Sequence, residues 1–324
     1  MITPVPIVQV QGIIPPSEDA AMASTLDTNT TSASPPISHE MHCMEIIGGN
    51  QSLRQSLSAP GLDVWIDSRP CTGSAGGDIY YFSTCGSGRV TRLAVADVSG
   101  HGPDMDHIAK WLRRLMRKHI NLLDQTRFAR AVNREFTSYS ASACFATGLL
   151  ATYFAPTEHL IVCNAGHPRP IWYSRRLGRW QPLEPSTPDP GPSIRNAKGT
   201  YRLHRVSNLP LGIIEPTDYH QFAVKLEHDD IVVIYTDALI EARSPQNEMP
   251  GEDGLLAILR ELGPLPTDEL GPRLIERLDA WRDHAPPDDD QTIIILHHNT
   301  TTPPPMTLGR ALHALSKMVG LRHV

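Results

Sequence analysis

Residues 94–102 read Ala-Val-Ala-Asp-Val-Ser-Gly-His-Gly, a stretch that joins an apolar run to an acid and a glycine-rich turn. The apolar run Leu93–Ala96 indicates a buried strand that ends on the carboxylate of Asp97. Gly100 and Gly102 follow closely, so we expect a sharp turn directly after this acid. A carboxylate at a strand end, beside backbone carbonyls, is a typical ligand for a hard divalent cation. The alternative is an acid that only caps the strand end.

Three further acids stand at the edges of predicted strands. Asp78 precedes the apolar run 79–82, Asp237 follows the run 231–234, and Asp289 stands before a third run. Buried strands bring their ends together, so acids far apart in the sequence can converge on one point. Unpaired carboxylates would repel one another there, and bound cations would remove that repulsion.

The order of the predicted elements favours an α+β fold. Apolar periodicity predicts helices over 104–123, 128–139, 254–262 and 268–282, and strands over 62–67, 147–154, 160–164, 170–173, 201–206, 221–226, 231–235 and 292–297. Residues 44–58 fit either a short strand or a helix, and residues 177–200, rich in Pro and Gly, predict an irregular segment. The pattern alone leaves several layered arrangements open.

Six short motifs occur in an order typical of one protein family. They are Gly77-Asp78, residues 97–102, Asn164–Pro168, Leu211-Gly212, Tyr235–Asp237 and Asp289–Thr292. The chain resembles the metal-dependent protein serine/threonine phosphatases (PPM, protein phosphatase 2C-like), in particular their bacterial sporulation-protein-E-like branch. The resemblance runs from about Gly61 to His297 and implies a four-layer α-β-β-α sandwich of two antiparallel sheets flanked by helices.

The resemblance also implies a site with two divalent ions, Mn²⁺ or Mg²⁺. Asp97 would bridge both ions, and the carbonyl of Val98 would complete one coordination sphere. Asp78 would serve the first ion, directly or through water, and Asp237 and Asp289 the second. Asp97, Asp237 and Asp78 would carry catalysis by holding a hydroxide that attacks a phosphoserine or phosphothreonine ester.

Other polar residues near the motifs have open roles. His101 has either a part in the chemistry or a structural place in the turn, and His167 is expected to hold a hairpin by hydrogen bonds. Arg69 could contact a phosphate bidentately, although its spacing matches no motif of the family. The roles of Asp288 and Asp290, the neighbours of Asp289, are not separated by the sequence.

Two residues depart from the family pattern. Ala238 follows Asp237 where the family has Gly, and Pro103 follows the first motif where the family has small apolar residues. Alanine is the smallest replacement for glycine, so we expect activity to survive at position 238. Pro is well tolerated in the first turn of a helix, but the acids Asp104 and Asp106 that follow it could alter substrate docking or the field at the metals. The alternative is a catalytically silent phosphoprotein-binding module of the same fold. A phosphatase of small molecules would share the same chemistry.

Composition narrows the function classes. The chain has 324 residues, 40% hydrophobic and 20% charged, with a net charge of −6, which disfavours general nucleic-acid or anionic-membrane binding. No apolar run approaches the roughly 18 residues of a membrane span. No Lys or Arg precedes Arg54, and the five cysteines form no CxxC motif, so we expect a cytoplasmic protein with free thiols.

We expect three regions along the chain. Residues 1–42 predict a disordered tail, 43–299 the PPM-type phosphatase domain, and 300–324 a Pro-rich break followed by an amphipathic helix. This last helix would dock either on the protein itself or on a regulatory partner. The family branch implies a phosphorylated anti-sigma-factor antagonist as the substrate and partner.

Overall fold

The computed structural model describes residues 38–42, 45–86, 88–99, 103–139, 144–185 and 208–303, without the side chains of 103–106. All of these residues belong to the unit 36–324. The predicted disordered tail is almost entirely outside the described residues, as are His101, the predicted strand 201–206 and the predicted C-terminal helix.

Two β-sheets form the centre of the described unit. The seven-stranded sheet has the order β1 (His39–Glu40), β3 (Leu53–Ala59), β4 (Leu62–Arg69), β13 (Gln291–His298), β12 (Ile231–Tyr235), β9 (Ile171–Ser174) and β10 (Arg179–Pro182). The six-stranded sheet has the order β11 (Gln221–Lys225), β8 (His159–Ala165), β7 (Ala146–Phe154), β6 (Val90–Val98), β5 (Ala75–Cys85) and β2 (Ile46–Gln51). Neighbouring strands pair antiparallel except β1 and β3, which are parallel.

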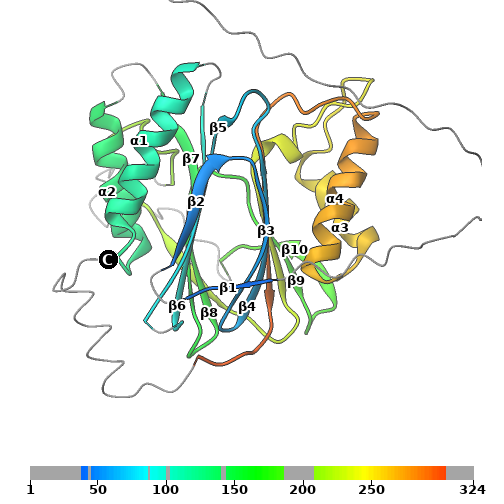
Figure 1. Ribbon diagram of the computed structural model, residues 1–324, viewed down its shortest axis with the longest axis horizontal. Coiled ribbons are helices and arrows are strands. Elements are labelled where there is room, and N and C mark those ends of the chain that lie inside the picture. The colour runs from blue at the N-terminus through cyan, green and yellow to red at the C-terminus, as the bar shows by residue number, and fades with distance from the viewer. Residues whose placement is uncertain are drawn as a thin grey trace, which may run out of the picture. The chain divides into compact units, whose positions relative to one another are not determined.

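Two pairs of helices cover the outer faces of the sheets (Figure 1). α1 (Pro103–His119) and α2 (Gln125–Tyr139) pack against the six-stranded sheet, and α3 (Gly251–Leu262) and α4 (Thr267–Trp281) pack against the seven-stranded sheet. A third apolar core fills the space between the two sheets. The predicted α-β-β-α sandwich is confirmed.

The sequence of β12 explains why this strand lies in the interior of its sheet, between β13 and β9. Val232 and Ile234 belong to the core between the sheets, whereas Ile231, Val233 and Tyr235 belong to the core under α3 and α4. A strand that is buried on both faces has no polar side to alternate with. All five residues of β12 are therefore apolar, and the first acid, Asp237, comes only after the strand has ended.

The structure corrects two boundaries. Residues 177–200 were expected to be irregular, but Arg179–Pro182 forms β10, because a turn with Gly178 at φ 62° returns the chain alongside β9 and buries Trp180. The phosphatase domain was expected to begin at residue 43, but β1 pairs with β3 and Met41 is buried in the core between the sheets. One buried methionine and a two-residue strand give no periodic signal.

Residues 44–58, which the sequence left open, contain the two strands β2 and β3. The other predicted helices and strands that lie within the described residues are present, with ends shifted by a few residues. Among the described helices none is long and apolar enough to cross a membrane.

Candidate metal centre

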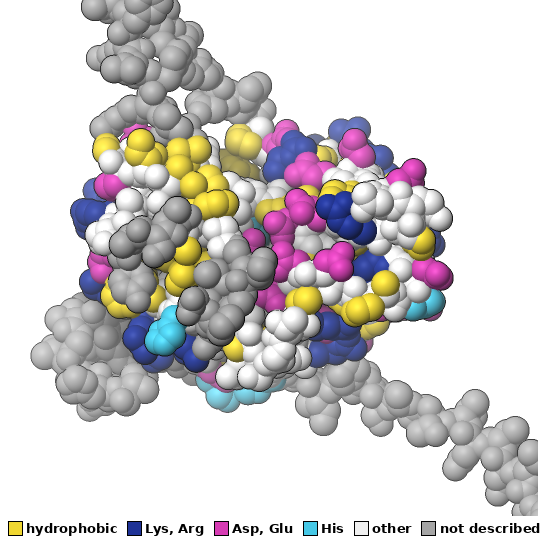
Figure 2. Space-filling model, turned by 90° about the horizontal axis from the view of Figure 1, so that it is seen from above, with side chains coloured by type: hydrophobic (Ala, Val, Ile, Leu, Met, Phe, Trp, Pro, Cys, Tyr) yellow, Lys and Arg dark blue, Asp and Glu magenta, His cyan; other side chains and the backbone are white. Residues whose placement is uncertain are grey.

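The predicted acids stand at strand ends on one end of the sandwich. Asp78 lies near the start of β5, Asp97 near the end of β6, and Asp237 opens the 3₁₀ helix η1 (Asp237–Leu239) directly after β12. Asp289 precedes β13 in the loop that follows α4. Seen from above, Asp and Glu side chains gather toward the middle of this face (Figure 2).

These carboxylates are close enough to shift one another's pKa. Burial raises the pKa of Asp97 to about 7, with further contributions from the charges of Asp237 and Asp289. Burial also raises the pKa of Asp78, and the charge of Asp97 adds to the shift. The pKa of Asp237 is raised by burial and then by Glu241 and Asp289. The structure thus brings together all four predicted acids and adds Glu241, which sequence reasoning missed.

Asp78 has a buried carboxylate oxygen that a cation would satisfy. Its side chain is buried, and its Oδ2 accepts a hydrogen bond of 2.8 Å from the hydroxyl of Thr236. Its Oδ1 is also buried but has no hydrogen-bond partner. A buried carboxylate oxygen without a partner is energetically costly, and a cation or a cation-bound water would satisfy it. This oxygen therefore fits a metal site.

Two glycines allow the backbone of β5 to approach the other acids closely. A Cβ atom built on Gly77 would lie 3.1 Å from the carbonyl oxygen of Val98 and 3.8 Å from Oδ1 of Asp97. A Cβ on Gly76 would lie 2.1 Å from Oδ2 of Asp290, which is far inside contact distance. The carbonyl oxygen of Val98 and Oδ1 of Asp97 therefore both lie close to the backbone of Gly77.

The acidic loop before β13 contains side chains with different surroundings. The Oδ1 of Asp290 accepts a hydrogen bond of 2.6 Å from the backbone N–H of Cys71, and its Oδ2 accepts one of 2.5 Å from the N–H of Gly77. Asp288 and Asp289 instead line a cavity. The structure therefore separates Asp290, whose two oxygens are occupied by backbone donors, from its neighbours.

This cavity has a volume of about 190 Å³, enough for several water-sized groups. Its lining residues are mainly acidic and basic side chains: Asp237, Ala238, Glu241, Ala242, Arg243, Arg282, Asp288 and Asp289. Two of the four predicted metal ligands, Asp237 and Asp289, therefore line this cavity.

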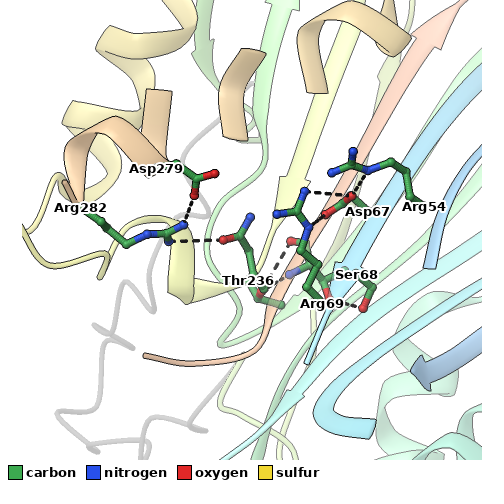
Figure 3. A network of polar contacts seen from close by, with 9 residues as sticks. Arg54, Asp67, Ser68, Arg69, Thr236, Asp279 and Arg282 are labelled. Atoms are coloured by element: carbon green, nitrogen blue, oxygen red, sulfur yellow. Dashed lines mark hydrogen bonds and ion pairs between the residues drawn. The ribbon is translucent and has the colours of Figure 1, made fainter. Parts of the chain in front are cut away.

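Arg282 is the buried cation of this cavity and caps the C-terminus of α4. It donates to the carboxylate of Asp279 at 2.5 Å and to Oε1 of Gln291 at 3.4 Å, and its Nε has no hydrogen-bond partner (Figure 3). Arg282 precedes the acidic loop and Gln291 follows it, so this contact joins the two ends of the loop. Sequence reasoning missed both residues.

The donor set suits hard divalent cations. The candidate ligands are carboxylate and carbonyl oxygens, which Mg²⁺ and Mn²⁺ prefer, whereas Zn²⁺ prefers His and Cys. Within the described ranges, no three His, Cys, Asp or Glu side chains already converge as a preassembled metal-binding group. Metal binding would therefore draw the acids closer than their mutual repulsion allows without ions.

His167 has the structural role that the sequence predicted. Its backbone N–H donates to Oδ1 of Asn164 at 2.7 Å, and Nδ2 of Asn164 donates to the carbonyl of His167 at 2.8 Å. Its ring Nδ1 lies 3.0 Å from the hydroxyl of Thr147, which pairs with Asp97 in the sheet. Burial lowers the pKa of His167 to about 3, so the ring is neutral at physiological pH.

Arg69 is directed to a protein carboxylate. Its Nε lies 2.7 Å from Oδ1 of the buried Asp67, which also pairs with Arg54 (Figure 3). The guanidinium of Arg69 thus balances a buried charge, and the structure gives no support to a phosphate-binding role.

The two departures from the family pattern fit the backbone. Ala238 lies within the right-handed 3₁₀ helix η1, a conformation that needs no glycine. Pro103 is the first residue of α1, where its missing N–H leaves no helical hydrogen bond unmade.

Comparisons with known proteins agree with this fold. The family model of stage II sporulation protein E (SpoIIE) matches residues 87–299. The chain belongs to this family. It is therefore homologous to the PP2C-type serine/threonine phosphatases, which are hydrolases. A search of curated protein sequences finds no match.

Several solved structures share the fold at low sequence identity. The RsbU and RsbW domains of a Mycobacterium tuberculosis protein are 22% identical with a TM-score of 0.56, covering 80% of this chain and 68% of that one. The PP2C phosphatase domain of SpoIIE from Bacillus subtilis, with a fragment of its regulatory domain, is 16% identical with a TM-score of 0.54, covering 79% and 64%. RsbX in complex with magnesium is 16% identical with a TM-score of 0.51, covering 76% and 99%.

Proposed function

We propose that this protein is a Mn²⁺- or Mg²⁺-dependent phosphatase that hydrolyses phosphoserine or phosphothreonine on a partner protein. The observation that carries the proposal is the convergence of four sequence-distant acids, in which Asp97 has a pKa of about 7 and Asp78 keeps one buried oxygen without a partner. Membership of the SpoIIE family and the likeness to magnesium-bound RsbX support a divalent metal.

We propose the metal-binding roles that the family resemblance implies. Asp97 would bridge two ions, with the carbonyl of Val98 as a further ligand, Asp78 would serve the first ion, and Asp237 and Asp289 the second. The ions would neutralise the phosphoryl oxygens and supply a hydroxide nucleophile.

The chain's own groups keep the ligands in place. The hydroxyl of Thr236 donates to Oδ2 of Asp78, so that Oδ1 would be the oxygen that serves the ion. The neutral ring of His167 contacts Thr147, the partner of Asp97 in the neighbouring strand. These contacts orient Asp78 and support the strand beside Asp97, so that binding of the ions would only have to draw the carboxylates closer together.

An exposed apolar segment beside the centre favours a protein substrate. Ile213 and Ile214 are 48% and 47% exposed, and they follow Leu211, which bridges to Ala146. Ala146 pairs with Val98 in the sheet, so this segment begins next to the metal ligands. Exposed apolar surface next to a reaction centre is typical of contacts with a macromolecule.

The solved relatives support a class of partner. In the Mycobacterium tuberculosis protein, an RsbU domain and an RsbW domain share one chain. We therefore propose a partner-switching pathway whose phosphorylated anti-sigma-factor antagonist is the substrate. Cys71, Cys85, Cys144 and Cys163 are free thiols, which supports the proposed cytoplasmic location.

Hydrolysis of p-nitrophenyl phosphate with Mn²⁺, compared between the wild type and Asp97→Ala, tests the activity. We expect turnover that needs Mn²⁺ and is lost in the variant. A wild type that binds Mn²⁺ but does not turn over would favour the silent phosphoprotein-binding module. Release of phosphate from a phosphorylated antagonist protein, compared with free phosphoserine, then distinguishes a protein substrate from a small one.

A further inference from the structure

At the end that carries the acids, the two sheets are joined by two side-chain hydrogen bonds. The carboxylate of Asp290, next to β13 in the seven-stranded sheet, accepts from the N–H of Gly77 in β5 of the six-stranded sheet. The hydroxyl of Thr236, at the end of β12, donates to Asp78, the residue after Gly77. The proposed metal centre has two halves, the acids on the six-stranded sheet and the acids on the seven-stranded sheet. These two hydrogen bonds connect the halves directly next to the proposed ligands.

The carboxylate of Asp290 fills a backbone cradle. Its two oxygens accept from two amides, Cys71 at 2.6 Å and Gly77 at 2.5 Å, which lie on either side of the turn leading into β5. Gly76 leaves the space that the carboxylate occupies, since a Cβ there would lie 2.1 Å from Oδ2. Charge-assisted hydrogen bonds of this kind are among the stronger ones in proteins.

We propose that Asp290 is a positioning residue that sets the separation between the two halves of the metal centre. It holds Asp78, on the six-stranded sheet, against Asp237 and Asp289, on the seven-stranded sheet. Because two ions must share ligands from both halves, this separation determines how tightly the second ion binds. The inference rests on the proposed metal centre and deepens it.

Asp288 provides a matched control. It lies in the same loop and carries the same charge, but it lines the cavity and is exposed to solvent. If the loop acted only through its negative charge, Asp288→Asn and Asp290→Asn would weaken metal binding alike. If the hydrogen bonds of Asp290 fix the geometry, only Asp290→Asn would do so, because the new amide N–H₂ faces a backbone N–H that it cannot accept from.

Gly76→Ala provides a second test that changes no charge. The added methyl group would displace the Asp290 carboxylate from its cradle. We therefore expect it to reproduce the effect of Asp290→Asn.

The experiment is calorimetric titration of Mn²⁺ into the full chain, with thermal melts of the metal-free proteins to establish folding. We expect the second ion to bind about tenfold more weakly to Asp290→Asn and Gly76→Ala than to the wild type, and within about twofold of wild type to Asp288→Asn. Wild-type affinities in folded Asp290→Asn, or an equal loss in Asp288→Asn, would overturn the inference while leaving the metal centre intact. A wild type that binds no Mn²⁺ would instead refute the proposed function together with it.

Discussion

Thr236 donates its hydroxyl hydrogen to Oδ2 of Asp78 at 2.8 Å and accepts the backbone N–H of Thr292 at 2.9 Å. One buried hydroxyl thereby connects an acid of the six-stranded sheet with two strands of the seven-stranded sheet. Thr236 also directly precedes Asp237. The acids on the two sheets are therefore held in a common frame by a residue that is itself no metal ligand.

Replacement of this hydroxyl tests the frame. Thr236→Val keeps the shape of the side chain but leaves Asp78 and the N–H of Thr292 without their partner, so we expect a loss of about 1–3 kcal/mol in the free energy of unfolding. Urea denaturation of the metal-free protein measures the loss. Thr236→Ser retains the hydroxyl and serves as the control. Equal stability of the Val and Ser variants would show that the hydrogen bond contributes little.

The pKa of Asp97 predicts a pH dependence of stability. In the folded chain without metal it is about 7, above the value of about 3.9 for an unfolded Asp. Between these values the folded chain binds more protons than the unfolded chain, so this residue's contribution to stability falls as the pH rises from 4 to 7. Thermal melts in chelator should show this decline, and Mn²⁺ at pH 8 should restore stability.

Asp97→Asn is the control for this effect, because an amide does not titrate. We expect the metal-free variant to lose less stability than the wild type between pH 4 and 7. Identical pH profiles would mean that burial and the neighbouring carboxylates do not raise the pKa of Asp97 as the structure indicates.

We predict that the contact between Arg282 and Gln291, which joins the ends of the acidic loop, stabilises the folded protein. Arg282→Met removes the hydrogen bonds to Asp279 and Gln291 but retains an apolar side chain of similar length. We expect a loss of about 1.5–3 kcal/mol in the free energy of unfolding, the range for hydrogen bonds to charged groups. Chemical denaturation checks this value, with Arg243→Met, a change at an exposed arginine of the same cavity, as the comparison. If both variants lost the same free energy of unfolding, the hydrogen bonds of Arg282 would not contribute to stability as predicted.

We predict that replacing Ala238 by the glycine of the family changes stability and turnover only slightly. Because Ala238 lies in a right-handed 3₁₀ helix and is largely buried, Ala238→Gly should lower stability by about 0.5–1 kcal/mol through backbone entropy. Turnover of p-nitrophenyl phosphate should stay within about twofold of the wild type. A large gain in turnover would indicate that alanine had been suppressing the activity.

The sequence predicts the parts of this molecule that depend on local pattern. The sequence predicts β12 with its observed ends because five apolar residues follow one another there, and all five are buried in the structure. The four acids were found because each lies next to such a run. By contrast, β10 depends on one turn and one buried Trp180, and the residues before it read as irregular.

Roles that depend on distant contacts could not be read from the chain. Asp290 and Gly77 are 213 positions apart, so the hydrogen bond that separates Asp290 from Asp288 and Asp289 has no local signature. Glu241 stands four residues after Asp237, a spacing that places them on adjacent turns, and this was an unused signal. Asp279 and Arg282 are three residues apart at the end of α4, which was a second unused signal, whereas the contact of Arg282 with Gln291 crosses the acidic loop to β13.

The most direct test of the account is anomalous diffraction from crystals of the full chain grown with Mn²⁺. We predict two ions about 4 Å apart, both in contact with Asp97, one also with Asp78 and the other with Asp237 and Asp289. Well-ordered crystals in which Mn²⁺ contacts none of these carboxylates, or lies elsewhere on the molecule, would contradict it.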